Sequence, residues 1–257
     1  DGATVSWTEA GTATQWIVEY DTAGFTLGTG ISQLLTSDTL VITGLEPNTP
    51  YDVYVRAYCG VSDSSTWLKG DFRTKCLPYT EDMLPYTETF EAYSASSSIT
   101  STINPCWTRW STSTSTTTIY PYISTVTSNG ASDKVMYMYG TTSIRSVLAM
   151  PAFDVELSTL QVEFDLVRTS TSGISPLLVG VMSDPEDLST FDTLAIVTCS
   201  RQSTWERFEI PLVSYTGDGT YIAFVTPQGV ASYNYIDDIT VTTISECATP
   251  INVVASN

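Results

Sequence analysis

One stretch of the sequence joins a turn to a strand: Gly44-Leu45-Glu46-Pro47-Asn48-Thr49-Pro50-Tyr51-Asp52-Val53-Tyr54-Val55-Arg56-Ala57. Two prolines and an asparagine between residues 46 and 50 are typical of a tight turn. From Tyr51 onward every second residue is aromatic or aliphatic, which is the period of a β-strand with one buried face. This stretch therefore predicts β-structure.

The same alternation recurs on both sides of that stretch, in short runs rich in β-branched and aromatic residues. The runs lie at residues 3–8, 16–20, 39–42 and 69–74. No part of the chain shows a sustained 3.6-residue period, so no long helix is expected. We therefore expect residues 1–76 to form an all-β, immunoglobulin-like sandwich with a strand about every ten residues.

Residues 45–57 resemble the corner between strands E and F of a fibronectin type III domain. The motif L-x-P-x-T-x-Y-x-V-x-V-x-A is filled at every position, beginning at Leu45. The resemblance implies that Trp7 is the core tryptophan of strand B and that the Tyr51 hydroxyl bonds back to the turn backbone. It covers strands B to G, so strand A is expected to be missing at the N-terminus.

The segment 245–257 resembles the start of a following module, with Cys247-Ala248-Thr249-Pro250-Ile251-Asn252-Val253 as its strand A. Written ahead of residue 1, this strand would complete a module, which predicts an array in which two module types alternate. In the resembling modules a cysteine at the start of strand A lies near one at the end of strand F. The hypothesis is that Cys247 and Cys59 are complements across a module boundary.

The five cysteines are Cys59, Cys76, Cys106, Cys199 and Cys247. They form no CxxC pair and the chain has no histidine, so a zinc site built on thiolates is not indicated. One or two disulfides formed in an oxidising compartment fit the pattern, and the odd number suggests a partner outside this segment. Buried, reduced cysteine is the alternative.

Residues 77–87 contain two Leu-Pro-Tyr triplets and are expected to form an extended, fairly stiff linker. Strand patterns return after it and continue to residue 244, with no helical pattern between them. Roughly eight or more strands in this length fit a two-sheet jelly roll. The predicted organisation is therefore a sandwich at 1–76, a linker at 77–87 and a jelly roll at 88–244.

Four motifs in the second region carry another resemblance: Glu88-Thr89-Phe90-Glu91, Asn104-Pro105-Cys106-Trp107-Thr108, Gly180-Val181-Met182-Ser183-Asp184-Pro185 and Tyr235-Ile236-Asp237-Asp238-Ile239-Thr240-Val241. In their order and spacing they are similar to the MAM-like jelly roll of bacterial cleaved-adhesin (choice-of-anchor J) domains. Such domains stand beside fibronectin type III modules in secreted and surface proteins of host-associated bacteria. The resemblance implies a secreted or cell-surface location and a role in adhesion.

Composition excludes several classes of function. The 257 residues include 10 Lys and Arg, 28 Asp and Glu and no His, for a formal charge of −18. Nucleic acid and anionic lipid repel such a chain, and histidine-dependent catalysis is excluded. The longest apolar runs, such as residues 176–182, fall far short of the roughly 20 residues that span a bilayer, so direct membrane insertion is not expected.

A structural calcium ion is the cofactor that the sequence indicates. Calcium prefers carboxylate and carbonyl oxygens, and the resembling jelly rolls hold it where the first and last strands meet. Glu91 closes the first strand, and the alternation along residues 235–241 places the Asp237 carboxylate on the core side, where it needs a metal or several donors. Further candidate ligands are Asn129, Ser132 and Asp238. In the alternative, Asp237 merely accepts backbone N–H bonds.

A glycan site is the second candidate. Jelly rolls that bind sugars stack aromatic rings on pyranose rings beside hydrogen-bonding groups. Tyr120-Pro121-Tyr122 and Tyr233-Asn234-Tyr235 lie beside turn signals, so Tyr120, Tyr122, Tyr233 and Tyr235 are the candidate ligand-binding residues. The alternative is that these aromatic residues belong to the core, as most do in sandwiches.

Catalysis is not expected. Carboxylates cluster at residues 81–82, 184–187 and 237–238, but a glycosidase needs two across a cleft, which proximity in sequence does not supply. No nucleophile elbow, phosphate loop or H-E-x-x-H motif is present. We expect a non-catalytic segment that recognises glycan or a host extracellular protein and adjoins neighbouring modules of the same chain. Two alternatives stay open: a structural spacer that presents another domain, catalytic or not, and an unrecognised carboxylate-dependent glycoside hydrolase.

Overall fold

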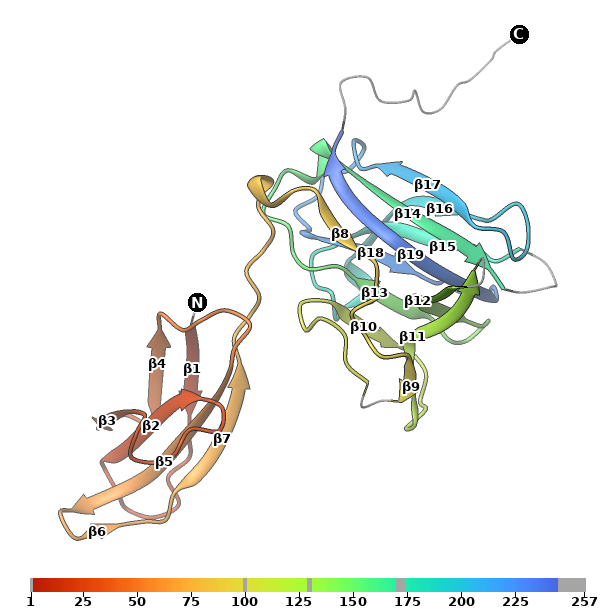
Figure 1. The fold of residues 1–257 in the computed structure, drawn as a ribbon. Helices are drawn as coiled ribbons and strands as arrows, with labels where there is room; N and C mark the ends of the chain where they lie inside the picture. The colour runs from red at the N-terminus through yellow and green to blue at the C-terminus, as the bar shows by residue number, and fades with distance from the viewer. Residues whose placement is uncertain (1, 99–100, 129–130, 170–173, 245–257) are drawn as a thin grey trace. The chain divides into compact units, whose positions relative to one another are not determined.

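The computed structural model describes residues 2–98, 101–128, 131–169 and 174–244. The chain divides into two compact units, Asp1–Leu77 and Pro78–Asn257. Both are built from β-strands, as Figure 1 shows, which confirms the all-β fold class. Within the described ranges, no helix has the length and apolar character needed to cross a membrane.

The first unit contains two antiparallel sheets around one core. The smaller sheet pairs β1 (Gly2–Ser6) with β4 (Thr39–Thr43). The larger sheet has the order β3-β2-β5-β6, with β7 paired to β5. Its strands are β2 (Trp16–Thr22), β3 (Ile31–Leu35), β5 (Pro50–Gly60), β6 (Asp63–Ser64) and β7 (Leu68–Arg73). Alternate residues of both sheets, among them Val18, Ile42 and Val53, form the core.

The corner before β5 is held by a tyrosine. Tyr51 is buried, and its hydroxyl accepts a hydrogen bond from the Glu46 backbone N–H at 3.0 Å. Leu45 is buried in the same core, and Trp7, just after β1, packs against it while half-buried. The Trp7 and Trp16 rings meet edge to face with 5.9 Å between centroids. The Tyr51 hydroxyl therefore links the turn at residues 46–50 to β5, the strand that follows it.

Removing the corner hydroxyl tests this contact. Tyr51→Phe keeps the ring but leaves the Glu46 N–H without its acceptor, so the free energy of unfolding of the first unit is expected to fall by about 1 kcal/mol. Tyr54→Phe is the matched control, because no described residue hydrogen-bonds the Tyr54 hydroxyl. Denaturant titration of both variants provides the measurement. Equal stability of the two variants would contradict the expected role of the corner.

The cysteines differ in state. Cys59, near the end of β5, is an exposed free thiol, and Cys199 is a buried free thiol. Cys76 and Cys106 are disulfide-bonded. Cys247 lies outside the described residues together with the whole segment 245–257. The pairing of Cys59 with a cysteine of the Cys247 type across a module boundary therefore stays a prediction.

Residues 78–87, part of the segment predicted as a linker at 77–87, group with the second unit. The Tyr79 N–H donates to the Ala152 carbonyl, and the Asp154 N–H donates to the Tyr79 carbonyl, both at 2.8 Å. Tyr86 is buried, and its ring meets that of Tyr79 edge to face at 4.6 Å. The prolines indicated a stiff connection, but the tyrosines beside them have apolar area to bury and anchor the segment.

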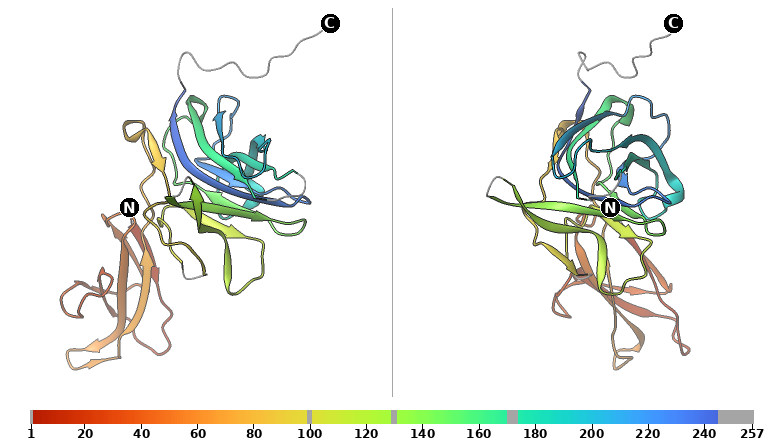
Figure 2. Two further views of the ribbon diagram at one scale, coloured as in Figure 1. Left: turned by 45° about the vertical axis from the view of Figure 1, so that its right-hand side comes forward. Right: turned by 90° about the vertical axis from the view of Figure 1, so that its right-hand side faces the viewer.

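Two antiparallel sheets form the second unit (Figures 1 and 2). The seven-stranded sheet has the order β17-β14-β19-β12-β11-β9, with β8 paired to β19. Its strands are β8 (Tyr86–Glu88), β9 (Ser96–Ser98), β11 (Thr118–Ser128), β12 (Ala131–Gly140), β14 (Leu160–Arg168), β17 (Glu206–Pro211) and β19 (Ser232–Thr243).

The five-stranded sheet has the order β10-β13-β18-β15-β16. Its strands are β10 (Thr108–Ser111), β13 (Ser146–Ala149), β15 (Leu177–Met182), β16 (Phe191–Val197) and β18 (Tyr221–Val225). Short 3-10 turns occur at Glu81–Met83, Leu157–Thr159 and Leu188–Thr190. The core lies between the two sheets, where the Phe164 and Phe224 rings meet edge to face at 5.1 Å. The other face of the seven-stranded sheet carries the candidate sites.

A β-bulge in β19 changes which face its side chains occupy. Opposite Phe164, β19 has two residues, Asp238 and Ile239, where β14 has one, and Asp238 takes a positive φ of 47°. Ile239 is therefore in the core, whereas Asp237 lies on the same sheet face as Tyr235. The prediction that Asp237 shares the core face with Ile239 was wrong, because it assumed an unbroken alternation.

Candidate functional site

Six tyrosine rings stand together on the outward face of the seven-stranded sheet, and we call this set the tyrosine face. It consists of Tyr120 and Tyr122 on β11, Tyr137 and Tyr139 on β12, and Tyr233 and Tyr235 on β19. One residue separates the members of each pair, so the pleat of the strand puts both rings on one side. The intervening Met138 and Asn234 are fully buried on the other side.

Strand register arranges the tyrosine face in two rows of three, with a β12 tyrosine at the centre of each row. In one row the Tyr137 ring centroid lies 5.3 Å from that of Tyr122 and 5.1 Å from that of Tyr235. In the other row Tyr139 stacks on the β11 ring at 4.5 Å and lies 5.3 Å from the β19 ring. Such separations are typical of rings in direct contact, so the six rings form one continuous surface.

The hydroxyl groups of the tyrosine face remain available. All six residues are half-buried, and none of their hydroxyls hydrogen-bonds to another described residue. Burial raises the pKa of Tyr122, Tyr137 and Tyr139, and neighbouring tyrosines add to the shift. These hydroxyls therefore stay neutral at physiological pH and can both donate and accept. The surface offers apolar rings and free polar groups side by side.

The structure brings together all four tyrosines predicted to bind ligand, Tyr120, Tyr122, Tyr233 and Tyr235. It places them within strands, not beside turns as the sequence indicated. The central Tyr137 and Tyr139 were not among the predicted site residues. Their spacing of two residues was a visible signal, but the sequence does not show that β12 lies between β11 and β19.

Four carboxyl groups influence one another where β8, β12 and β19 meet: Glu91, Asp133, Asp237 and Asp238. Glu91 Oε1 accepts a hydrogen bond from the Lys134 backbone N–H at 2.8 Å. This bond is the main cause that lowers the pKa of Glu91, and a second hydrogen bond, with the Asp133 side chain, lowers it further. The hydrogen bond to Glu91 raises the pKa of Asp133. Glu91 therefore loses its proton more readily than Asp133 does.

Asp237 is the most perturbed carboxyl of this acidic cluster. Its residue is only 5% exposed, and the Asp238 backbone N–H donates to Oδ1 at 2.8 Å. Burial raises the pKa of Asp237 to about 8, and the charges of Asp238, Asp133 and Glu91 act in the same direction. An ionised carboxylate in such a place is costly unless a cation neutralises it.

Three of the five predicted metal ligands, Glu91, Asp237 and Asp238, lie in this cluster. Asn129 lies outside the described residues, as does the side chain of Ser132. Asp133 was not predicted, although it precedes Lys134, whose amide binds Glu91. Among the described residues, no three acidic or thiol side chains form a metal-binding set by themselves. A cation here would also need carbonyl or water oxygens, which calcium accepts.

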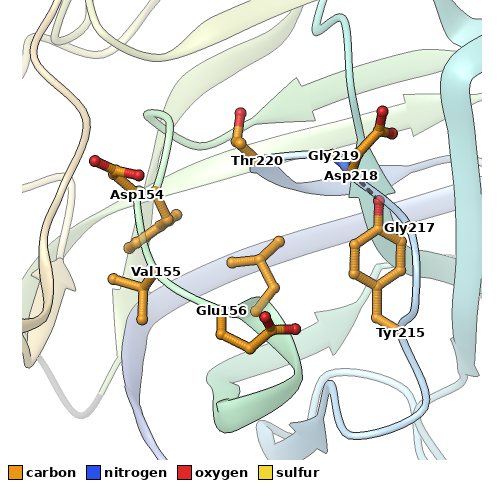
Figure 3. Close-up of a pocket in the computed structure, with 10 residues that line it drawn as sticks. Asp154, Val155, Glu156, Tyr215, Gly217, Asp218, Gly219 and Thr220 are labelled. Carbon is orange, nitrogen blue, oxygen red and sulfur yellow. Dashed lines mark hydrogen bonds between the residues drawn. The ribbon is translucent and has the colours of Figure 1, made fainter.

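A separate pocket of about 260 Å³ lies between residues 153–157 and residues 215–220. Its carboxylates, Asp154, Glu156 and Asp218, are exposed and point in different directions (Figure 3). The Tyr215 hydroxyl accepts from the Gly219 N–H at 2.6 Å, which closes the loop at one wall. The lining of this pocket does not present the facing pair of carboxylates that glycoside hydrolysis requires.

Comparison with known families gives a match within the first unit. Residues 1–70 match the model of the fibronectin type III domain, so the first predicted resemblance is confirmed. The search of curated proteins finds no match.

Three similar solved structures all have low sequence identity. The K1 cleaved adhesin domain of Lys-gingipain from Porphyromonas gingivalis W83 is 16% identical, with a TM-score of 0.45 over 63% of this chain and 99% of that chain. The K2 cleaved adhesin domain of Lys-gingipain is 15% identical, with a TM-score of 0.46 over 62% and 99%. A family 11 carbohydrate-binding module from Clostridium thermocellum is 15% identical, with a TM-score of 0.34 over 55% and 90%.

Proposed function

We propose that the second unit is a non-catalytic module that binds glycans on the tyrosine face, within a secreted or cell-surface protein. The observation that carries the proposal is the tyrosine face itself, with six half-exposed rings in two contacting rows. Fibronectin type III domains are typical of extracellular proteins, which supports that location.

The chemistry of the tyrosine face suits a sugar. A pyranose ring has an apolar face that packs on an aromatic ring and hydroxyls around its edge that need hydrogen-bond partners. The free tyrosine hydroxyls supply those partners beside the apolar surface. The centroids of neighbouring tyrosine rings in this row are 4.5 and 5.3 Å apart. An extended oligosaccharide can therefore lie along a row and contact several rings at once.

The alternatives are less favoured by the same observations. A structural spacer has no need to keep six aromatic rings half-exposed on one face, because burying them would stabilise the fold. A glycoside hydrolase needs two facing carboxylates, and those of the pocket in Figure 3 do not converge. A host extracellular protein is a second partner class for the same face, so a binding test needs to include such proteins.

Replacing the central ring of one row tests the proposal. Tyr139 contacts Tyr120 and Tyr233 in its own row and lies 6.2 Å from Tyr137 of the other row, so Tyr139→Ala removes one ring of the surface and the contacts that this ring makes. We expect roughly a tenfold or greater loss of affinity for the glycans that the wild-type protein binds on an array. Calorimetric titration with the best array ligand gives the affinity.

Two further variants make the result specific. Tyr139→Phe retains the ring and is expected to lose less affinity than Tyr139→Ala. Tyr58→Ala removes a half-buried tyrosine from the first unit and is expected to bind as the wild type does. If the folded wild-type protein binds no glycan on a broad array, or if Tyr139→Ala binds unchanged, the proposed function is wrong. Binding to extracellular matrix proteins alone would assign the face to a protein partner.

We also propose that calcium binds at the acidic cluster and stabilises the second unit. The buried Asp237 and the Glu91–Asp133 pair provide oxygen ligands of the kind that calcium prefers. Backbone carbonyls and water would complete the shell, because the described side chains do not suffice alone. A calcium ion there would neutralise the carboxylates that otherwise repel one another.

A further inference from the structure

The row of the tyrosine face that ends at Tyr235 continues beyond β19. Val167 of β14 lies opposite Tyr235 in the β14–β19 pair, so both side chains stand on the same face of the sheet. The last pair between β14 and β17 joins Leu166 to Glu206. Trp205, one residue earlier in the chain, therefore stands at the level of Val167 and on the same face. The row thus passes through a valine and ends at a tryptophan.

Val167 leaves a depression between two aromatic side chains. Tyr235, Val167 and Trp205 all line a pocket of about 290 Å³, and Val126 of β11 lines it as well. Val167 is only 6% exposed, whereas Tyr235 and Trp205 are half-buried. The pocket therefore has valine at its base and aromatic walls. Its volume is close to the lower limit of about 300 Å³ for sites that hold a small ligand.

Two residues with hydroxyl groups also line the pocket, Thr169 and Ser203. The Thr169 hydroxyl donates to the Tyr233 carbonyl at 3.3 Å, which leaves its oxygen able to accept a further bond. Ser203 is exposed, and no described residue hydrogen-bonds its hydroxyl. The pocket therefore combines an apolar interior with polar groups that can both donate and accept.

The charges around the pocket favour a neutral ligand. None of its lining residues, all of which are described, is acidic, so no carboxylate is present to hold a cationic group. Arg168 also lines the pocket, but it pairs with the fully buried Asn234, so its side chain lies on the core side of β14. The formal charge of the chain is −18, which repels anionic sugars.

We propose that this pocket binds the acetamido group of an N-acetylated sugar in a neutral glycan that lies along the row. The proposal rests on the glycan-binding function proposed above and adds the class of glycan. The acetyl methyl packs on Val167 and Trp205, whereas a bare sugar hydroxyl there would lose its water partners against an apolar surface. The amide N–H and carbonyl both need partners, which the hydroxyls of Thr169 and Ser203 supply.

Two pairs of neutral probes isolate the acetamido group. Cellotriose and triacetylchitotriose share one β-linked backbone and differ in the groups at C2, and lactose and N-acetyllactosamine differ in the same way at one sugar. Each probe is titrated calorimetrically into the intact chain. We expect the acetylated member of at least one pair to bind roughly tenfold more tightly than its partner. The first pair represents amino-sugar polymers and the second represents glycoprotein branches, and a preference in either pair supports the proposal.

Deacetylated chitotriose separates the acetyl group from charge. Its amino groups are cationic, and the acidic chain attracts them. It lacks the methyl groups and amides that the pocket is proposed to bind, so it is expected to bind more weakly than the acetylated trimer. Equal or tighter binding of the deacetylated trimer would contradict the inference.

Matched variants test the pocket. Val167→Phe fills the depression and is expected to remove the preference for the acetylated probes. Trp205→Ala removes one wall and is expected to reduce this preference, whereas Trp205→Phe is expected to retain part of it. Val213→Phe is the control, because it adds the same bulk at a residue that is 55% exposed and outside the pocket lining. Circular dichroism and melting temperature verify folding, and the Trp205 variants supply the test if Val167→Phe does not fold.

The outcomes distinguish this inference from the function on which it rests. If the members of both pairs bind equally, the inference is wrong, while binding that still depends on Tyr139 keeps the proposed function. If folded Val167→Phe and Trp205→Ala retain the full preference for the acetylated probes, the acetamido group binds elsewhere and the inference is wrong. If no glycan binds to the folded protein, both proposals are wrong.

Discussion

Calcium is expected to raise the melting temperature of the second unit at pH 7 to 8, and Asp237→Asn is expected to abolish that rise. A ligand present at a hundred times its Kd stabilises the folded state by roughly 2.7 kcal/mol, which corresponds to roughly 5 to 10 °C for a domain of this size. Differential scanning calorimetry in EDTA and in millimolar calcium gives both values. The predicted dependence arises because Asp237 is buried among other carboxyls and lacks a cationic partner among the described residues.

The pH dependence without calcium has a definite sign. The pKa of Asp237 is about 8 in the folded protein, against about 3.9 in an unfolded chain. The folded state therefore holds a proton that the unfolded state has lost, so the contribution of Asp237 to stability is fully present below about pH 4 and is lost as the pH rises through about 8. The slope is at most about 1.4 kcal/mol per pH unit. Asp133, whose pKa is also raised, acts in the same direction.

Calcium binding and the pH dependence of Asp237 together predict that the stability order of the wild type and Asp237→Asn reverses between EDTA and calcium. In EDTA at pH 8 to 9, Asp237→Asn is expected to be more stable than the wild type, because the amide carries no buried charge. In calcium the wild type is expected to be the more stable of the two. Asp192→Asn, an exposed position on β16, controls for the loss of one charge. An identical wild-type melting temperature in EDTA and calcium would show that no calcium binds, and a flat pH profile in EDTA would contradict the buried, protonated Asp237.

The corner from Leu45 to Ala57 was predictable because its signals are local. A turn with two prolines, a strand of period two and a tyrosine at their junction all lie within these thirteen consecutive residues. The buried Tyr51 and its bond to the Glu46 N–H need only that short range of chain. The second unit also reads as all-β for this reason, since each of its strands carries its own pattern.

The candidate sites depend on long-range relationships that no local pattern contains. Tyr137 contacts both Tyr122 and Tyr235 because β12 lies between β11 and β19, and strand order follows from the whole topology. The sheet face on which the Asp237 side chain lies was predicted wrongly for a related reason. A single extra residue in a strand reverses the faces beyond it, and composition does not reveal which strand pair accommodates a bulge.

The motif that begins at Gly180 leads to the last prediction, Gly180→Ala, which is expected to destabilise the second unit by about 3 kcal/mol. A Cβ there would overlap the Asp192 carbonyl oxygen and lie 2.9 Å from the Phe191 ring. The obstacle is the backbone of β16, paired to β15 at a register shift between Val179 and Gly180, so it cannot be relieved by a rotamer change. Either β16 moves or its pairing breaks.

Gly229→Ala provides the contrast that isolates the cause. Gly229 has a positive φ of 75°, and no atom lies within 4 Å of the place where its Cβ would stand. Alanine there meets backbone strain but no neighbour, at a cost of roughly 1 to 2 kcal/mol. Denaturant titration of the two variants is expected to place Gly180→Ala clearly below Gly229→Ala in stability. Equal losses would mean that β16 yields easily at this point. The close approach of the two strands would then not be what requires glycine in the motif, because a strand that moves freely leaves room for a methyl group.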